Sequence, residues 1–344
     1  MESRREFIYK TGLLSMAALW PLNKNNVEMQ NIHQNVLPIK AKRLNPGDTI
    51  AISSPAGAVW DVLQVEKFVS ILKSFGFNLI LGKTLSLKNG YLAGTDEERA
   101  AELNMFFSNK EVKGIFCMKG GWGCARILDK LDYEQIKQNP KIIIGFSDVT
   151  SLLNAIYTKT RLITFHGPVG NSGWNDFTSG VFKNIICKGE KNIFPKTNFE
   201  EDKIVTIMSG ISEGELIGGN LSVTTSLIGT SYLPSANGKI LFLEETKEEP
   251  YCIDRMLTQM QQAGFFSGLK GIVIGKFVKC EAEEPQKAFT FMEVLDQHFK
   301  PLGIPVYYGA MTGHIENKWT LPIGAKVKMN ADEGTLILQE PAVT

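Results

Sequence analysis

The stretch Lys141-Ile-Ile-Ile-Gly-Phe-Ser-Asp-Val-Thr-Ser-Leu-Leu-Asn-Ala-Ile-Tyr157 combines the patterns of a strand and of a helix. Its β-branched apolar start predicts a buried strand, and from Val149 onward its apolar residues recur at helical spacing. The turn between the two contains Ser147 and Asp148. A hydroxyl here would lie at the carboxyl edge of a sheet and at a helix N-terminus, where negative charge is favoured. Ser147 is therefore either a nucleophile or, like Asp148, a helix cap.

Strand and helix patterns alternate on the N-terminal side of this stretch. Short apolar strands are predicted at 48–54, 78–81 and 113–118, and helices at 62–75 and from Thr95 onward. This alternation predicts a parallel sheet with helices on both faces, in which ligands bind outside the carboxyl ends of the strands. Three loops should therefore meet at one sheet edge: Ser53–Gly57, Gly120–Gly123 and Gly145–Asp148.

The glycine-rich loop Gly120-Gly121-Trp122-Gly123 directly follows a predicted strand. It lacks the glycine spacing of a dinucleotide site, and it lacks the lysine and hydroxyl of a P-loop. The loop is either a tight turn or a place where the backbone approaches a ligand and its N–H groups hold an oxyanion.

The C-terminal half repeats strands and helices in a less regular order. Residues 169–205 have few apolar repeats, so we interpret them as an interdomain segment. We expect an N-terminal parallel-sheet α/β domain over 37–168 and a C-terminal mixed α/β domain over 206–344. The second domain is predicted to end in two short strands, at 320–321 and 336–338.

Two histidines are candidates for the general base of a serine nucleophile. His166 and His314 each follow a predicted strand and stand next to glycine. A histidine in this role needs an acceptor on its second ring nitrogen. Glu244 follows the strand 239–243 in the same predicted domain as His314, which favours a Glu244–His314 pair over one with His166. A purely structural role for His314 also stays open.

The first 36 residues are predicted to lie outside the fold. Arg4-Arg5 and the apolar run Gly12–Leu22 resemble a twin-arginine export signal, and the run is too short to span a bilayer. Residues 23–36 are polar and without periodicity, as in a linker. We expect an exported, periplasmic protein without a stable membrane anchor, with a cytoplasmic location as the alternative.

Composition excludes several classes of partner. Lys and Arg number 37 against 36 Asp and Glu, and a net charge of +1 argues against binding to nucleic acid or a membrane surface. None of the five cysteines forms a C-x-x-C pair, so neither a disulfide framework nor a zinc site is indicated. No metal or other cofactor is expected.

Several motifs, in matching order from about Pro46 to the C-terminus, resemble those of the LD-carboxypeptidases. This is the S66 serine peptidase family, which also contains the microcin C7 self-immunity peptidases. The serine turn reads G-F-S-D and so differs from the G-x-S-x-G elbow of α/β-hydrolases. The motifs that carry the resemblance are Gly120-Gly-Trp-Gly123, Leu131-Asp-Tyr133, Asn139-Pro-Lys141, Gly145-Phe-Ser-Asp-Val-Thr150, Thr164-Phe-His-Gly-Pro168, Gly218-Gly-Asn-Leu221, Leu243-Glu-Glu245, Tyr251, Asp254-Arg255, Gly313-His314 and Leu321-Pro-Ile-Gly324.

The resemblance implies a Ser-Glu-His triad in an active site between two domains. On the matching positions Ser147 is the nucleophile, His314 the general base and Glu244 its orienting acid. Glu244 is preferred to Glu245 because it is the first acid after the strand. The oxyanion hole would be formed by backbone N–H groups of Gly120, Gly121 and Asp148.

The resemblance also implies a substrate class. We expect a serine carboxypeptidase, assembled as a homodimer, that removes D-Ala from the L-centre of the diamino acid in murein tetrapeptides. The alternatives are a peptidase that detoxifies peptidyl-nucleotide antibiotics and a non-catalytic periplasmic peptide-binding protein. Candidates for the cation that binds the terminal carboxylate are Arg255, Lys119 and Arg126, and Trp122 and Trp174 are candidates to line the cleft.

Overall fold

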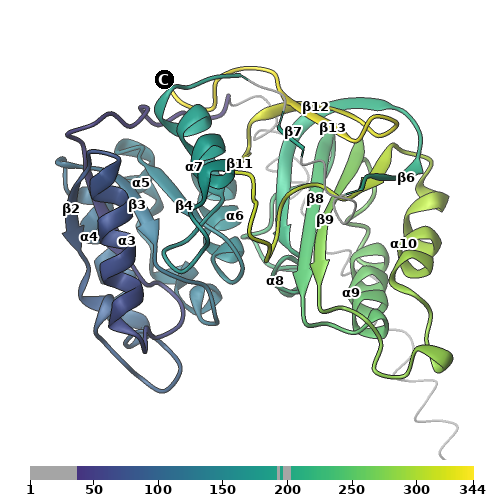
Figure 1. Cartoon of the computed structure of the whole chain (residues 1–344), viewed down its shortest axis with the longest axis horizontal. Helices are drawn as coiled ribbons and strands as arrows, with labels where there is room; N and C mark the ends of the chain where they lie inside the picture. Colours follow the sequence, from purple (N-terminus) through teal and green to yellow (C-terminus); the bar gives the residue numbers. More distant parts are fainter. Residues whose placement is uncertain (1–36, 192–193, 197–202) are drawn as a thin grey trace, which may run out of the picture. The chain divides into compact units, whose positions relative to one another are not determined.

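Two β-sheets organise the structure, a computed structural model in which residues 37–191, 194–196 and 203–344 are described (Figure 1). Both sheets belong to one compact structural unit, which spans Pro38–Thr344. The predicted export signal and linker, 1–36, lie outside the described residues. Within the described residues, no helix has the length and apolar character needed to cross a bilayer.

The first sheet has six strands in the order β11-β5-β4-β3-β1-β2. Its five N-terminal strands are parallel, as predicted, and β11 pairs with β5 in the antiparallel direction. The central strands are buried on both faces, which explains their continuous apolar runs. The strands are β1 (Thr49–Ser53), β2 (Asn78–Leu81), β3 (Val112–Cys117), β4 (Ile142–Gly145), β5 (Thr164–His166) and β11 (Leu321–Ile323).

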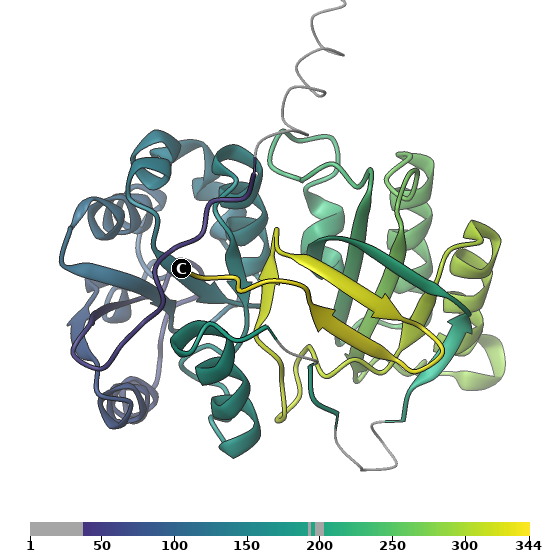
Figure 2. The same ribbon diagram turned by 90° about the horizontal axis from the view of Figure 1, so that it is seen from above.

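Helices cover both faces of the first sheet, and together they form the first lobe. Figure 2 shows α3 and α7 on one face and α4, α5 and α6 on the other. Phe75, just after α3, stacks on Phe182 of α7. Helix α4 begins with the capping box predicted from Thr95 and Glu98. The helices are α3 (Val62–Ser74), α4 (Asp96–Ser108), α5 (Tyr133–Gln138), α6 (Val149–Thr160) and α7 (Asp176–Phe182), with short η2 (Lys83–Leu85), η3 (Cys124–Lys130) and η4 (Lys183–Cys187).

The second sheet, with its helices, forms the second lobe. Its seven strands run in the order β13-β12-β7-β8-β9-β10-β6, and only β7 to β10 are mutually parallel. The predicted mixed architecture is therefore confirmed. The elements are β6 (Val205–Met208), β7 (Ile211–Asn220), α8 (Leu221–Ser226), β8 (Lys239–Thr246), α9 (Pro250–Gln262), β9 (Gly271–Val278), η6 (Pro285–Lys287), α10 (Phe291–Phe299), η7 (Lys300–Leu302), β10 (Val306–Tyr308), β12 (Lys326–Asn330) and β13 (Thr335–Leu338).

Two segments differ from the expected organisation. Strand β11, placed by sequence in the C-terminal domain, completes the first sheet, because Leu321 pairs with His166. The expected interdomain segment contains α7, whose Phe182 also packs on Phe116 of the first sheet. The chain therefore crosses from the first sheet to the second, returns to the first with β11, and then adds β12 and β13 to the second.

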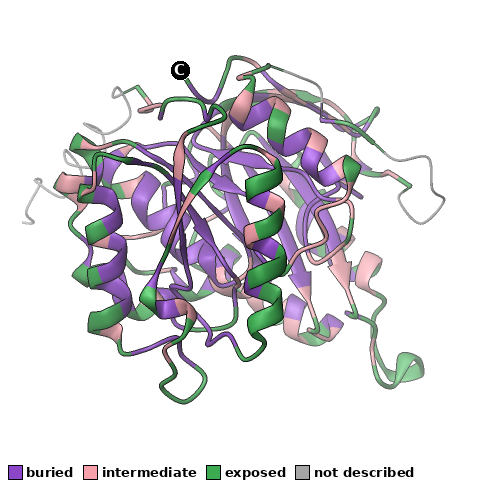
Figure 3. Ribbon diagram, turned by 60° about the vertical axis from the view of Figure 1, so that its left-hand side comes forward, coloured by how far each residue is buried: buried purple, intermediate pink, exposed green. Residues whose placement is uncertain are grey.

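The lobes touch where α6, the helix after the predicted nucleophile, packs on β7. The Nδ2 of Asn154 donates to the carbonyl of Gly218 (2.9 Å), and the N–H of Asn220 donates to Thr150 Oγ1 (3.1 Å). A Cβ on Gly219 would lie 2.5 Å from Thr150 Cγ2, so only glycine permits this approach. Figure 3 shows the strands of both sheets buried and the helices exposed along one side.

Candidate active site

Ser147 lies in the tight turn that connects β4 to α6. It is one of few described non-glycine residues with a positive φ, 63°, a conformation that costs free energy outside glycine and clusters at functional sites. A Cβ added to Gly120 would lie 2.8 Å from Ser147 Cβ and 2.9 Å from its Oγ. The glycine loop therefore lies directly against the serine hydroxyl, and a side chain at Gly120 would occupy this space.

The three loops that were predicted to share one sheet edge do meet there. The N–H of Gly57 donates to the carbonyl of Gly120 (3.2 Å). Arg99, which is fully buried, donates from Nη1 to the carbonyls of Pro55 (2.6 Å) and Gly123 (2.8 Å). A charged guanidinium thus fixes the first loop to the glycine loop, which limits the movement of their N–H groups.

Asp148 connects the glycine loop to the serine turn. Its side chain does not cap α6; instead Oδ2 accepts the N–H of Cys124 at 2.8 Å. Burial raises the pKa of the Asp148 carboxyl, and the hydrogen bonds from Cys124 and Gly123 oppose that rise. The backbone N–H of Asp148 lies close to Gly120, since a Cβ added to Gly120 would be 3.3 Å from the Asp148 nitrogen.

Glu244 and His314 form a hydrogen-bonded pair at the carboxyl edge of the second sheet. Nδ1 of His314 donates to Glu244 Oε2 at 2.9 Å. The Glu244 side chain is fully buried, whereas that of His314 is 24% exposed. Burial acts to raise the pKa of Glu244, but the two neighbouring histidines outweigh it and lower the pKa to about 2. An ionised acid on Nδ1 leaves Nε2 of His314 as the proton acceptor.

His166, the alternative base, faces Glu244 from the first lobe. Its Nε2 lies 3.8 Å from Glu244 Oε1, beyond hydrogen-bond distance, and its Nδ1 lies 3.4 Å from Thr312 Oγ1. The residue is 1% exposed. Because a general base must reach the substrate, the more open His314 suits that role and His166 does not.

The ring of Phe146 joins the two halves of the site. Phe146 immediately precedes Ser147, and its ring packs against the imidazole of His314 with centroids 4.8 Å apart. It also contacts His166 at 5.9 Å. The structure thus brings the serine turn from one lobe next to the Glu244–His314 pair from the other.

Glu245 has a different environment from its neighbour. Its Oε1 accepts the side-chain amide of Asn220 (2.8 Å), and its Oε2 accepts the N–H of Ser222 (2.7 Å). These bonds fix the start of α8. Both carboxylate oxygens of Glu245 thus have partners other than His314. The geometry therefore assigns contact with the histidine to Glu244.

The cations considered from the sequence are all engaged elsewhere. The ammonium of Lys119 donates to the carbonyl of Ala58 (3.1 Å), and Arg126 pairs with a carboxylate of α4 at 2.9 Å. Arg255 lies over the Tyr251 ring of its own helix. None of these contacts involves Ser147 or the Glu244–His314 pair.

The two tryptophans considered for the cleft differ in exposure. Trp174 packs on Phe68 of α3, with centroids 5.6 Å apart, and belongs to the packing of the first lobe. Trp122 is 46% exposed within the glycine loop. It is therefore available at the edge where Ser147 lies.

Lys318 is a site residue that the sequence did not reveal. It is 5% exposed, and its ammonium lies over the Phe146 ring, 4.3 Å from the centroid. Burial lowers its pKa to about 8, with an opposing influence from Glu244. Its position four residues after His314 is not a recognisable signal, because only the folded loop places it over Phe146.

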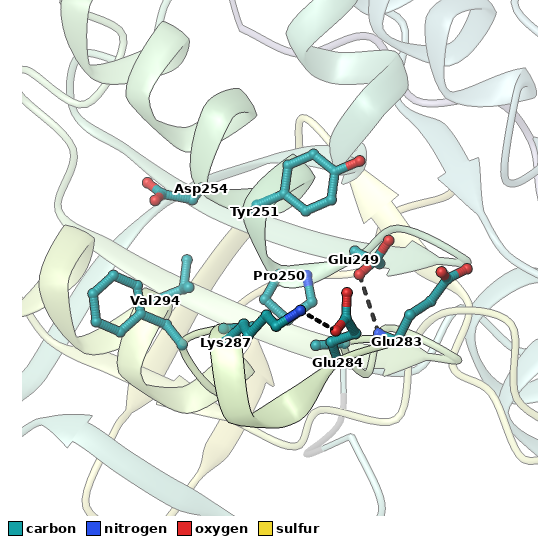
Figure 4. Close-up of a pocket in the computed structure, with 11 residues that line it drawn as sticks. Glu249, Pro250, Tyr251, Asp254, Glu283, Glu284, Lys287 and Val294 are labelled. Atoms are coloured by element: carbon teal, nitrogen blue, oxygen red, sulfur yellow. Dashed lines mark hydrogen bonds and ion pairs between the residues drawn. The ribbon is translucent and has the colours of Figure 1, made fainter.

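A separate hollow of about 500 Å³ lies in the second lobe beside the start of α9 (Figure 4). Glu249, Asp254, Glu283 and Glu284 give it an acidic lining, with Lys287 paired to Glu284. None of the residues assigned to the candidate triad lines it.

Comparison with known protein families agrees with this division of the chain into two parts. Residues 50–167 match the LD-carboxypeptidase N-terminal domain, and residues 213–329 match the LD-carboxypeptidase C-terminal domain. The chain belongs to the LD-carboxypeptidase family, the S66 peptidases. It is similar to the probable murein peptide carboxypeptidase of Bacillus subtilis (strain 168), at 37% identity over 88% of this chain and 95% of that protein.

The chain is also similar to a self-immunity protein and to solved structures of both kinds of relative. The microcin C7 self-immunity protein MccF of Escherichia coli is 32% identical over 88% of this chain and 96% of that protein. A solved structure of MccF in complex with glutamyl sulfamoyl guanosine has a TM-score of 0.81 at 30% identity, covering 89% of this chain and 100% of that one. The solved structure of the muramoyltetrapeptide carboxypeptidase from Oxalobacter formigenes has a TM-score of 0.73 at 27% identity. The match covers 85% of this chain and 99% of that one.

Proposed function

We propose that this protein is a serine carboxypeptidase that removes the terminal D-Ala from murein tetrapeptides. The observation that carries the proposal is the Glu244–His314 hydrogen bond, 2.9 Å long, whose histidine packs on Phe146, the residue before the strained Ser147. The similarity to a murein peptide carboxypeptidase over most of both chains supports the same class of substrate.

The proposed reaction is acyl transfer through Ser147. Nε2 of His314 takes the Ser147 proton while Oγ attacks the carbonyl carbon of the L-centre, and Glu244 stabilises the imidazolium that forms. His314 then gives the proton to the amine of D-Ala as the C–N bond breaks. A water molecule, deprotonated by His314, attacks the acyl-enzyme; the acyl–Oγ bond breaks and Ser147 regains its proton.

Backbone groups beside Ser147 are suited to the tetrahedral oxyanion. Gly120 lies against Ser147 Oγ, and the N–H of Asp148 is adjacent to both. We assign the oxyanion hole to N–H groups of Gly120, Gly121 and Asp148. One such donor typically contributes about 3 kcal/mol to transition-state stability.

A Ser147→Ala variant tests the proposal. Wild-type protein should release D-Ala from a purified murein tetrapeptide, as measured by mass spectrometry, and the variant should release none while still binding the peptide. Binding by both proteins without release by either would instead indicate a peptide-binding protein. Hydrolysis of a peptidyl-nucleotide but not of the tetrapeptide would instead favour the alternative of a peptidase that detoxifies such antibiotics.

The N-terminal residues add a proposal on location. We propose that the Arg4-Arg5 segment directs export, so that the enzyme meets murein peptides outside the cytoplasm. Replacing both arginines by lysine should retain the protein in the cytoplasmic fraction. An unchanged distribution between the fractions would contradict export through this motif.

A further inference from the structure

Lys318 lies beside the candidate triad without a counter-charge in contact. Its ammonium covers one face of the Phe146 ring, the same ring that packs against His314. In the described part of the chain the ammonium makes no hydrogen bond and no ion pair within 4.0 Å. Glu244, the nearest acid to influence it, is already bonded to His314.

The Lys318 side chain is largely buried, and its ammonium is in an unfavourable environment in the free protein. A ring face offers a modest cation–π attraction, about 0.5–2 kcal/mol, and removal of a charge from water costs more unless the charge is paired. Lys318 nevertheless keeps its charge at neutral pH, because its pKa lies near 8. The three N–H groups of this ammonium are thus available to an anion that enters the site.

The loop that carries Lys318 is firmly positioned. The backbone N–H of Lys318 donates to Thr178 Oγ1 (3.1 Å), and that hydroxyl donates to the carbonyl of Glu316 (3.0 Å). The side chains of Asn175 and Asn317 are joined at 2.7 Å. The start of α7 therefore holds the loop at several points, so the ammonium occupies a preformed position.

The proposed reaction supplies an anion at this place. In a carboxypeptidase substrate the free carboxylate lies two bonds from the amide nitrogen that leaves, so it must lie close to the base that protonates that nitrogen. His314 is that base, and Lys318 contacts the ring against which His314 packs. Of the alternatives, Lys119 lies at the same sheet edge but its ammonium already donates to the carbonyl of Ala58, whereas Arg126 and Arg255 contact a carboxylate of α4 and the Tyr251 ring.

We propose that the ammonium of Lys318 binds the free C-terminal carboxylate of the peptide and thereby restricts cleavage to the terminal residue. This inference rests on the proposed function, because it takes Ser147 and His314 as the reacting pair. In this proposal, a lysine of the loop between β10 and β11 makes the enzyme cleave the amide bond of the C-terminal residue rather than an internal amide bond.

The experiment compares a murein tetrapeptide ending in D-Ala with the same peptide bearing a C-terminal carboxamide. Wild-type protein should prefer the free acid by about 10- to 100-fold in kcat/KM, the range for a hydrogen bond to a charged group. Lys318→Met should lose this preference through a higher KM for the acid, with little change for the amide. Lys318→Arg should restore part of it.

Lys119→Met is the matched control, because it removes a lysine at the same sheet edge whose ammonium already has an acceptor. It should keep the wild-type preference. If Lys318→Met keeps the preference, or if Lys119→Met abolishes it, the assignment is wrong. The melting temperature of Lys318→Met should equal or exceed that of wild type, because an unpaired buried charge is removed; Lys318→Gln serves as a second variant if Lys318→Met does not fold.

Calorimetric binding in a Ser147→Ala background separates this inference from the proposed function. Tighter binding of the acid than of the amide, lost in Ser147→Ala/Lys318→Met, supports the carboxylate site even if wild-type protein cleaves neither peptide. Equal binding of acid and amide by Ser147→Ala overturns it, whether or not the wild-type protein is a peptidase.

Discussion

Replacing Glu244 by glutamine should abolish most of the turnover while leaving the fold in place. Glutamine has nearly the same shape, so it can keep contact with Nδ1 of His314, but it carries no charge. An imidazolium formed during the reaction would then face a neutral amide. The amide can also present its NH2 group to Nδ1, which would place the ring proton on Nε2, where the base must be free.

The size of the effect follows from the ionisation of Glu244. Its pKa falls from an ordinary 4.5 to about 2 despite complete burial, which is equivalent to about 3 kcal/mol in favour of the charged form. Because His166 and His314 share this interaction, loss of the part made with His314 in the transition state lowers kcat by up to about 100-fold. A reversed tautomer would deepen the loss to about 10⁴-fold, the effect seen when the acid of a serine-protease triad becomes an amide.

The assay is release of D-Ala from a tetrapeptide at saturating concentration, with the melting temperature of each variant measured in parallel. Glu245→Gln is the matched control, because its carboxylate bonds to Asn220 and the N–H of Ser222 rather than to a histidine. It should lower the melting temperature but keep kcat within about threefold of wild type, as expected for a change that acts only on stability. A Glu244→Gln variant with near-normal kcat, or a Glu245→Gln variant that alone loses turnover, would refute the assignment of the acid.

Three further predictions concern the packing and ionisation of the site. Gly120→Ala should lower kcat/KM at least about 100-fold, because the new Cβ would lie 2.9 Å from Ser147 Oγ and displace an oxyanion donor. Gly219→Ala should reduce the free energy of unfolding by about 2–4 kcal/mol, measured in urea, because its φ is positive and the facing helix leaves no room. Since the pKa of Glu244 is lowered on folding, its contribution of about 3 kcal/mol should be present above pH 4.5 and lost as the pH falls toward 2.

Each of these predictions has an internal control. Gly180→Ala, in helix α7 with open space around it, should leave activity and stability nearly unchanged, so equal losses in Gly120→Ala and Gly180→Ala would contradict steric displacement. Gly219→Ala with wild-type stability would show that α6 can move away from β7. For the pH series, the Glu244→Gln variant should lose less stability between pH 5 and pH 2.5 than wild type, and parallel curves would contradict the ionised Glu244.

The serine turn and its sheet edge were accessible from sequence because they depend on local patterns. A buried strand, a turn and an amphipathic helix occupy consecutive residues around Ser147, and the rule for parallel sheets places Gly120 and Gly57 at the same edge. The partner of His314 was favoured on similar grounds, since Glu244 and His314 follow strands of one sheet.

Features that depend on distant contacts were not accessible in this way. Strand β12 was missed between the two predicted C-terminal strands, and β11 was assigned to the wrong sheet, because edge-strand pairing is not encoded by local periodicity. Lys318 carries no local mark of function; its burial and its place over Phe146 arise from a loop that α7 holds. From the sequence alone, where the position of α7 is unknown, Lys318 would be interpreted as a charged residue on the surface.

The return of β11 to the first sheet has a consequence for synthesis of the protein. Its partner β5 lies far upstream in the chain, and the whole second sheet up to β10 is made in between. The last strand at that edge of the first sheet therefore cannot pair until the residues up to Ile323 have left the ribosome. Such a distant pairing is also slow to form. A nascent chain that already displays Ser147 would thus lack both the edge strand and the loop with His314 until the residues after β10 have been made.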